Sequence, residues 1–494
     1  MSKRWRIGSI PLLISLCLPV AAQDHAQAIR VNWDTVIAVS KTTPTLQVVV
    51  NPKLLAGSNL HDAAFEALHG LGADYVRFVP WFPYPRLVVA ELKPPADGRT
   101  FWNFSPIDPV VDDFMKATAG HSVVMNFSTI PAWMFRTSKP VTYPEDPNQV
   151  DWDYTQGTEL RDPSMKEVSA YYARLIGWYT QGGFRDEIGQ WHASGHHYKI
   201  AYWEVLNEVD AEHRWTPESY TKFYDAVTAA MRKVDPELKF VALALADPGG
   251  HPEMFEYFLN PAHHAGGTPL DFISYHFYAT PRRGEGPETW QYTFFDQEAG
   301  FLNTVRYVEA IRKRLSPSTK TDLDELGVIL PTDNQPGDDK PIASAYWNLA
   351  GALYADLYVH LARMGIEVAG ESQLVGYPTQ YPSVSMMDYV TAKPNARFRV
   401  LQLLKDHFSP GDRLVETGDA GDDLTVQAFE NARGKCILAI NKRLKGEAFR
   451  LPAGFRGTRI DYVAPSTGEQ PPMTKAVAGD TILLEPNEVA IISE

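Results

Sequence analysis

Short apolar runs recur along most of the chain, and longer amphipathic stretches separate them. The stretch 61–71 carries apolar residues at helical spacing, as does 220–234, which follows Thr216 and Pro217, a typical helix start. Eight runs have the length and the β-branched and aromatic content of buried strands. They are 45–50, 75–79, 122–127, 199–206, 238–245, 270–276, 320–325 and 366–371.

Eight strands that alternate with helices predict an α/β fold, the closed (β/α)8 barrel of the TIM type. The alternative is an open, doubly wound sheet, which usually carries a glycine-rich phosphate turn after its first strand. Here the first run is followed by Asn51-Pro52-Lys53, which contains no glycine. We therefore expect a barrel over residues 44–407, in which the long polar stretch 128–198 elaborates the connection after the third strand.

The pattern changes after His407, where short alternating runs are separated by turn residues. Such a pattern predicts an additional C-terminal all-β domain, a sandwich over residues 408–494. A further run at 28–33, within the N-terminal segment 23–43, precedes the barrel and is expected to add a strand to this sandwich. The C-terminal runs are 413–417, 424–430, 435–441, 447–451, 458–463, 481–484 and 489–492.

The N-terminus has the features of a secretory signal peptide over residues 1–22. Lys3, Arg4 and Arg6 precede an apolar run over 7–20, and small residues follow at a cleavage site ending at Ala22. The run is too short for a membrane anchor, and no other segment has the length of a membrane-spanning helix. We therefore expect a secreted or periplasmic protein that leaves the membrane once the signal is removed.

Composition narrows the possible partners. The formal net charge is −14, and no long basic run is present, which disfavours binding to nucleic acid. Aromatic residues make up 12% of the chain, and aromatic rings suit carbohydrate partners because the C–H faces of sugars stack on them. Of the two cysteines, Cys17 lies in the signal peptide, so Cys436 cannot form an internal disulfide in the mature chain. The sequence does not indicate an oligomeric state.

Polar residues stand where the predicted barrel strands end, which is where active sites of this fold lie. Two of them are glutamates, Glu208 after the fourth strand and Glu325 at the end of the seventh. A carboxylate in such an apolar setting is costly unless it is paired or sits at an opening. Two converging carboxylates are the minimal set for cleaving a glycosidic bond. An arginine such as Arg77 favours the ionised form of the nucleophile, and Tyr278 can hydrogen-bond it.

Three segments together resemble family 39 of the glycoside hydrolases, within clan A. They are Glu204-Val205-Leu206-Asn207-Glu208-Val209, Ser274-Tyr275-His276-Phe277-Tyr278 and Arg77-Phe78-Val79. The family contains retaining β-xylosidases and α-L-iduronidases that carry an added β-sandwich. The resemblance implies that Glu208 is the acid/base, that Glu325 is the nucleophile and that Asn207 binds the sugar 2-hydroxyl. It implies neither a cofactor nor a metal. The other candidate substrate-binding residues are Arg77, His276, Tyr278, Trp81, Asn126, Trp133 and Glu371.

Several positions depart from the family pattern, which leaves the sugar open. A β-xylosidase-like activity is the first expectation. An iduronidase-like, arabinosidase or exopolysaccharide glycosidase activity is the alternative, as is a non-catalytic carbohydrate-binding protein on the same scaffold. Neither the linkage nor exo or endo action is indicated. The departures are Leu206 for Trp, Val209 for Pro, Val79 for His, and Asp324 and Leu326 around the nucleophile.

Some of these residues also have structural interpretations. Glu371 is a rival nucleophile, and Asp322, Asp324 and Glu325 could form a solvated edge. Arg77 could be a core ion pair, and Glu204, which shares strand parity with Glu208, is expected to pair with a cation inside the barrel. The histidine pairs at 196–197 and 263–264 suggest a metal site, but adjacent side chains point apart and no third ligand is suitably spaced.

Overall fold

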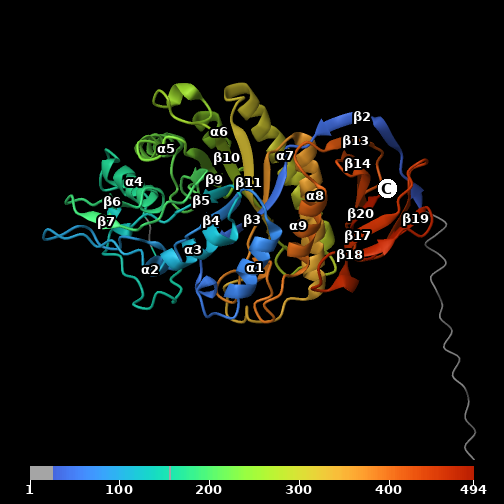
Figure 1. Cartoon of the computed structure of the whole chain (residues 1–494), viewed down its shortest axis with the longest axis horizontal. Coiled ribbons are helices and arrows are strands. Elements are labelled where there is room, and N and C mark those ends of the chain that lie inside the picture. Colours follow the sequence, from blue (N-terminus) through green and yellow to red (C-terminus); the bar gives the residue numbers. More distant parts are fainter. Residues whose placement is uncertain (1–25, 155–156) are drawn as a thin grey trace, which may run out of the picture.

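The computed structural model describes residues 26–154 and 157–494. Its centre is a closed barrel of eight parallel strands, each paired with the next in chain order (Figure 1). This confirms the predicted (β/α)8 fold, and all eight predicted runs contribute a strand. The strands are β3 (Thr43–Val49), β4 (Val76–Val79), β5 (Val123–Met125), β8 (Tyr202–Glu204), β9 (Lys239–Leu245), β10 (Phe272–Ala279), β11 (Lys320–Val328) and β12 (Val368–Glu371).

A helix follows each barrel strand and covers its outer face. The first, α1, turns Ala64, Phe65, Leu68 and Leu71 toward the strands, as its apolar spacing predicts. The helices are α1 (His61–Leu71), α3 (Asp108–Ala117), α4 (Lys166–Thr180), α5 (Pro217–Met231), α6 (Pro252–Phe258), α7 (Trp290–Leu315), α8 (Ser344–Met364) and α9 (Ala396–His407).

The connections carry short additional elements. The described part of the insertion after β5 contains α4 and a hairpin of β6 (Gly183–Arg185) and β7 (Trp191–Ala193). Single helical turns stand in other loops, several of them at the barrel mouth. They are η2 (Pro52–Leu54), α2 (Pro85–Val88), η3 (Ala132–Met134), η4 (Pro261–His263), η5 (Pro382–Val384) and η6 (Pro465–Thr467).

The C-terminal region forms two β-sheets, as predicted. A seven-stranded sheet has the order β18-β17-β20-β15-β14-β13-β2, and a three-stranded sheet has the order β1-β16-β19. The sequence pattern missed β18, which is short and mostly exposed. The C-terminal strands are β13 (Arg413–Thr417), β14 (Leu424–Asn431), β15 (Gly434–Asn441), β16 (Glu447–Arg450), β17 (Arg459–Val463), β18 (Met473–Ala476), β19 (Thr481–Leu484) and β20 (Val489–Ser493).

The seven-stranded sheet buries both faces. Alternate residues such as Ile437 and Ala439 pack with the three-stranded sheet, while Leu438 and Ile440 join the core that contains the barrel helices. At this junction the ring of Phe429 stacks on that of Phe408, just after α9, with centroids 3.9 Å apart. The sandwich therefore lies against α8 and α9 (Figure 1) and shares one hydrophobic core with the barrel.

The N-terminal strands belong to the sandwich sheets. β1 (Gln27–Ala28) pairs in parallel with β16, and β2 (Val31–Val39) pairs antiparallel with β13. The predicted signal peptide over residues 1–22 lies outside the described residues. Within the described ranges, none of the helices combines the length and hydrophobicity needed to cross a membrane.

Candidate active site

A cavity of about 180 Å³ opens at the carboxyl ends of the barrel strands. Both predicted catalytic glutamates line it, together with three of the predicted substrate-binding residues. A (β/α)8 barrel places its chemistry at this end. The lining residues are Gln47, Val49, Val79, Trp81, Asn207, Glu208, Tyr278, Glu325, Ile329, Gln373, Tyr381 and Val384.

Glu208 is held by an irregular backbone just beyond β8. Leu206 and Glu208 both adopt left-handed conformations, with φ of 67° and 42°, which are unfavourable for side chains other than glycine. The Glu208 N–H donates to the carbonyl oxygen of Ala244 at 2.8 Å. That carbonyl is presented by a register shift in β9, where Leu243 and Ala244 also have positive φ. The Glu208 side chain is 23% exposed and thus faces the opening.

Glu325 is fixed from two sides and is only 10% exposed. Arg77 Nη1 donates to Glu325 Oε1 at 2.5 Å, and the Tyr278 hydroxyl donates to Oε2 at 2.7 Å. Burial and the charge of Glu325 raise the pKa of Tyr278 well above its ordinary value, so this tyrosine remains a donor. The contacts leave Glu325 little rotational freedom, as a nucleophile that must approach along one line requires.

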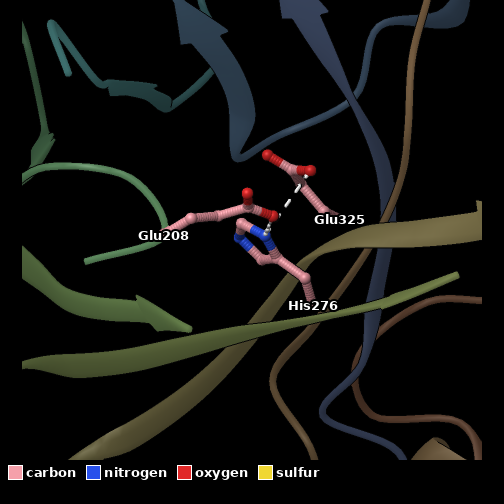
Figure 2. Close-up of side chains that lie close together, drawn as sticks. All are labelled: Glu208, His276 and Glu325. Carbon is pink, nitrogen blue, oxygen red and sulfur yellow. Dashed lines mark hydrogen bonds and ion pairs between the residues drawn. The ribbon is translucent and has the colours of Figure 1, made fainter. Parts of the chain in front are cut away.

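His276 connects the two glutamates (Figure 2). Its Nδ1 lies 2.9 Å from Glu208 Oε1 and 3.5 Å from Glu325 Oε2, and these three atoms lie within 4.8 Å of one another. Burial on its own lowers the pKa of His276. The charge of Glu325, the 3.5 Å contact with Asp324 and the hydrogen bond with Glu208 outweigh burial and raise the pKa well above its ordinary value. These surroundings therefore favour the imidazolium form of the ring.

The same three side chains have the residue types and spacing of metal ligands. A histidine binds a metal through an unprotonated nitrogen. In this structure the Nδ1 of His276 lies at hydrogen-bonding distance, 2.9 Å, from Glu208 Oε1 and 3.5 Å from Glu325 Oε2. We interpret the three side chains as a hydrogen-bonded group of two acids and one histidine.

Arg77 organises the floor of the site. It is buried, and its guanidinium reaches Glu204 at 2.5 Å, Gln47 at 2.7 Å and Asn207 at 2.7 Å, in addition to Glu325. A planar guanidinium can satisfy several acceptors at fixed angles, which a lysine could not. Arg77 therefore forms both of the contacts that the sequence suggested, a core ion pair and a contact with Glu325. Its core partner Glu204 lies buried against it inside the barrel.

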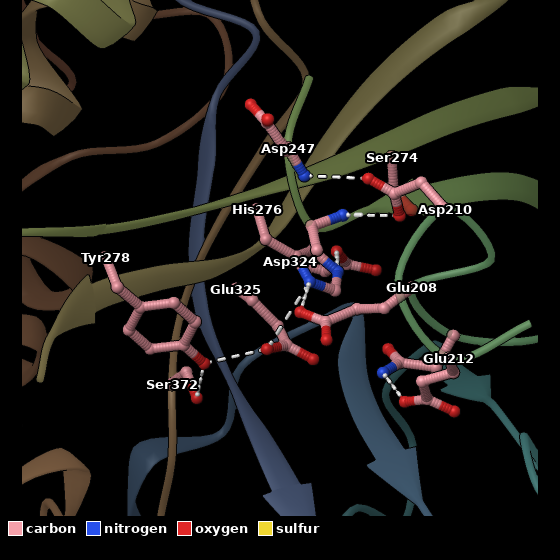
Figure 3. A network of polar contacts seen from close by, with 12 residues as sticks. Glu208, Asp210, Glu212, Asp247, Ser274, His276, Tyr278, Asp324, Glu325 and Ser372 are labelled. Atoms are coloured by element: carbon pink, nitrogen blue, oxygen red, sulfur yellow. Dashed lines mark hydrogen bonds and ion pairs between the residues drawn. The ribbon is translucent and has the colours of Figure 1, made fainter. Parts of the chain in front are cut away.

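Two loop carboxylates support the rim (Figure 3). Glu212 accepts from Asn207 Nδ2 and from Trp81 Nε1, both at 2.8 Å. Asp210 accepts from the backbone N–H groups of Ala246 and Asp247 at 3.0 and 2.8 Å, which ties the loop after β8 to the loop after β9. The segment that carries Glu208 is thus anchored on both sides.

Comparison with known proteins agrees with this arrangement. Residues 18–349, about two thirds of the chain, match the sequence profile "Glycosyl hydrolases family 39". The chain belongs to glycosyl hydrolase family 39. A curated "Beta-xylosidase" from Caldicellulosiruptor saccharolyticus is 24% identical over 213 residues, which cover 42% of this chain and 37% of that protein. The match thus spans well under half of that relative.

Solved structures share the fold of this family 39 protein over 94% of its length. A GH51 arabinofuranosidase from Xanthomonas axonopodis pv. citri has a TM-score of 0.63 at 14% identity, with 99% of that chain covered. A GH30 endoxylanase from Clostridium papyrosolvens C71 has a TM-score of 0.57 at 15% identity, also with 99% covered. At these identities the likeness concerns the barrel and its β-sheets rather than the substrate.

Some predicted site residues of this family 39 protein lie away from the cavity. Asn126 is buried beneath it and donates to Glu204 Oε2 at 2.5 Å. The indole of Trp133 donates to the carbonyl of Glu91 at 2.7 Å, and the guanidinium of Arg161 covers its ring, so Trp133 packs a loop. Trp133 does not line the cavity, and its contact with substrate stays a prediction.

Glu371 also does not line the cavity. It is fully buried at the end of β12, and Arg397 from α9 donates to it at 2.7 Å. Burial, partly offset by Arg397, raises the pKa of Glu371 to about 7. The interpretation of Asp322 and Asp324 as a solvated edge is likewise wrong, because both are buried.

Sequence reasoning missed four residues at the site, namely Gln47, Gln373, Tyr381 and Glu212. Gln47 is a polar residue inside an apolar strand, which was a usable signal. Gln373 follows Glu371 on the same chain segment, and Glu212 follows Glu208 by one helical turn. Tyr381 lies in a loop with no recognisable pattern, and its φ of 50° turns it toward the cavity.

A larger hollow of about 600 Å³ lies beside the catalytic cavity, where the loop after β11 meets Leu444 of the sandwich. Its wall includes Leu330 and Pro382, whose chain neighbours Ile329 and Tyr381 line the catalytic cavity. Its acids are used structurally: Asp333, for example, accepts from the N–H and hydroxyl of Ser383. We therefore place the chemistry in the smaller cavity.

Removing the positive charge beneath β12 is expected to cost much stability. The Arg397→Met change leaves Glu371 buried without its cation, and also removes donors to the carbonyls of Val384 and Ser372. We expect the free energy of unfolding to fall by about 3–5 kcal/mol, measured by urea titration. Arg136→Met is the matched control, because its partner Glu159 is exposed, and it should cost under about 1 kcal/mol. Equal losses in the two variants would contradict the argument.

Proposed function

We propose that this protein is a retaining glycoside hydrolase in which Glu208 and Glu325 perform a double displacement. The observation that carries the proposal is the approach of the two carboxylates, whose nearest oxygens lie within 4.8 Å at the mouth cavity. Retaining enzymes place their carboxyl groups about 5–5.5 Å apart, whereas inverting enzymes leave about 6.5–9.5 Å for a water molecule. An approach of the nearest oxygens to within 4.8 Å favours the retaining arrangement, in which Glu325 attacks the sugar directly.

Each glutamate has the environment that its role requires. Glu325, clamped by Arg77 and Tyr278, attacks the anomeric carbon while Glu208 protonates the departing glycosidic oxygen. Glu208 then takes a proton from water, which attacks the anomeric carbon and releases Glu325. The greater exposure of Glu208 suits the residue that must meet both leaving group and water.

The cavity supports a neutral pentose as the preferred sugar. Among the described lining residues, the charged ones are Glu208 and Glu325, and the nearby cation Arg77 is already engaged by carboxylates. A uronic acid would therefore bring its charge beside acids without a free counter-charge. The family 39 resemblance led us to expect a histidine at position 79. Val79 instead adds to an apolar wall, which has no hydrogen-bonding group for a further hydroxymethyl or carboxyl group of the sugar. We therefore favour a β-xylosidase-like activity over an iduronidase-like one.

Hydrolysis of a panel of aryl glycosides tests this proposal. The panel contains β-xyloside, α-L-arabinofuranoside, α-L-iduronide, β-glucoside and β-galactoside of one chromogenic phenol. We expect the highest kcat/KM on the β-xyloside and the lowest on the iduronide, because the cations Arg77 and His276 are already paired with the site's carboxylates. Proton NMR of the fresh product should show the β-anomer first, because two displacements retain configuration.

Two results would contradict the proposal. Faster turnover of the iduronide would show that a cation reaches the sugar, and initial release of the α-xylose anomer would show inversion. Binding of xylo-oligosaccharides without turnover of any panel member would favour the non-catalytic carbohydrate-binding protein.

We also propose that the protein is exported, on the basis of the basic and apolar N-terminal pattern and the small residues ending at Ala22. N-terminal sequencing of the protein recovered outside the cytoplasm tests this proposal. We expect the mature chain to begin at Gln23.

A further inference from the structure

Asp324 and Glu325 are consecutive residues that both point into the barrel. In a regular strand, neighbouring side chains point to opposite faces. Here β11 contains a bulge: Asp322 pairs with Ser274 and Glu325 with His276, so three steps in β11 match two in β10. The same shift occurs against β12. Bulges insert one extra residue and redirect side chains, and they are common beside active sites.

The bulge places the carboxylate of Asp324 behind both cations of the site. One oxygen lies 3.1 Å from Arg77 Nε. The other lies 3.5 Å from His276 Nε2 (Figure 3). The opposite nitrogen of His276 faces Glu208 and Glu325. The imidazole is thus held between one carboxylate that borders the floor and two that border the substrate.

Asp324 differs from the other buried acids near His276 in the direction of its pKa shift. Burial, together with the nearby Asp324 and Glu204, raises the pKa of Asp322 well above its ordinary value, which favours its neutral form. Burial likewise raises the pKa of Glu204 to about 8. Burial alone would raise the pKa of Asp324 too, but Arg77 and His276 bring it below its ordinary value. Asp324 therefore carries the negative charge behind the ring.

We infer that Asp324 is a positioning residue that keeps His276 charged and oriented, so that its Nδ1–H follows the negative charge between Glu325 and Glu208 during the reaction. This inference rests on the proposed double displacement. Before attack, the charge is on Glu325. Once Glu325 has become an ester and Glu208 has given up its proton, the charge is on Glu208. A single N–H placed 2.9 Å from one acid and 3.5 Å from the other can serve both, and Asp324 stays ionised throughout.

The pH dependence of the Asp324→Asn variant tests this role. The pKa of His276 is raised in the native protein, so the imidazolium form is lost only at high pH. Removing the charge of Asp324 lowers that pKa, and the alkaline limb of kcat/KM should move to lower pH by about one unit or more. We therefore expect roughly a tenfold or greater loss near pH 8 and a much smaller loss near pH 5.

Asp322→Asn is the matched control. It removes a buried carboxyl two residues away on the same strand, but the surroundings favour the neutral form of that carboxyl, so we expect the alkaline limb to move far less. A loss of activity in Asp324→Asn that is the same at every pH would overturn the inference, because a merely structural role predicts that result.

A measurement on the unmodified protein covers the case in which Asp324→Asn does not fold or the enzyme has no activity on the panel. Nitrogen-15 NMR of the histidine rings, with the His276 signals assigned from a His276→Gln variant, reports the protonation of each ring nitrogen. We expect both nitrogens of His276 to carry protons at pH 7.5. A neutral ring at that pH would refute the role of Asp324, whatever the sugar.

Discussion

Glu325→Gly is expected to lower kcat/KM for the best aryl glycoside by about 10⁴-fold or more, roughly 5.5 kcal/mol of transition-state free energy. The change removes the attacking oxygen while leaving Arg77 and Tyr278 to hold the space. Azide should enter that space and restore turnover, giving a glycosyl azide of inverted configuration. The measurement is steady-state kinetics with and without azide, and NMR of the product.

The control for this prediction is Glu371→Gln, on the neighbouring strand. Glu371 is buried against Arg397 and does not border the cavity. The Glu371→Gln variant should therefore keep most of its activity at temperatures where the protein remains folded. If Glu371→Gln lost as much activity as Glu325→Gly while remaining folded, the nucleophile would have been assigned to the wrong strand.

Glu208→Gly is expected to show a loss that depends on the leaving group. For sugar or alkyl leaving groups, which need protonation, kcat/KM should fall by about 10²–10⁴-fold. A dinitrophenyl leaving group departs without a proton, so its first step should be nearly unaffected. Its glycosyl-enzyme should then accumulate, because no base activates water. Rapid-mixing experiments should therefore show a burst of phenol followed by slow turnover.

Glu212→Gln separates this effect from damage to the loop. Glu212 lies four residues beyond Glu208 and holds Asn207 and Trp81. Losing this support should raise KM for all leaving groups alike. A leaving-group dependence as steep as that of Glu208→Gly would mean that Glu212, rather than Glu208, supplies the proton.

The parts of the site that follow from strand periodicity could be predicted from the sequence. The eight apolar runs give the barrel, and the residues at their ends include Glu208, Tyr278 and Glu325, because parallel strands end on one face. The roles of these residues remain predictions, since geometry places side chains without showing turnover.

What the sequence could not predict depends on register and on distant partners. The bulge in β11 turns Asp324 inward, and no local pattern announces a shift of one residue. Glu371 looked like a second strand-end acid, but Arg397, on the next helix, occupies it. The orientation of Trp133 also depends on a distant partner, because Arg161, in the insertion after β5, lies over its ring.

The pairing of the chain's first described strands with its last region has a consequence for how the molecule assembles. β2 pairs with β13, and β1 with β16, so strands near residues 27–39 find partners beyond residue 412. During synthesis from the N-terminus, these strands emerge early but must wait for nearly the whole chain. Closing so long a loop is slow, and an unpaired strand is prone to associate with other chains meanwhile. We therefore expect the β-sandwich to close last, when strands near residue 30 meet those beyond residue 412.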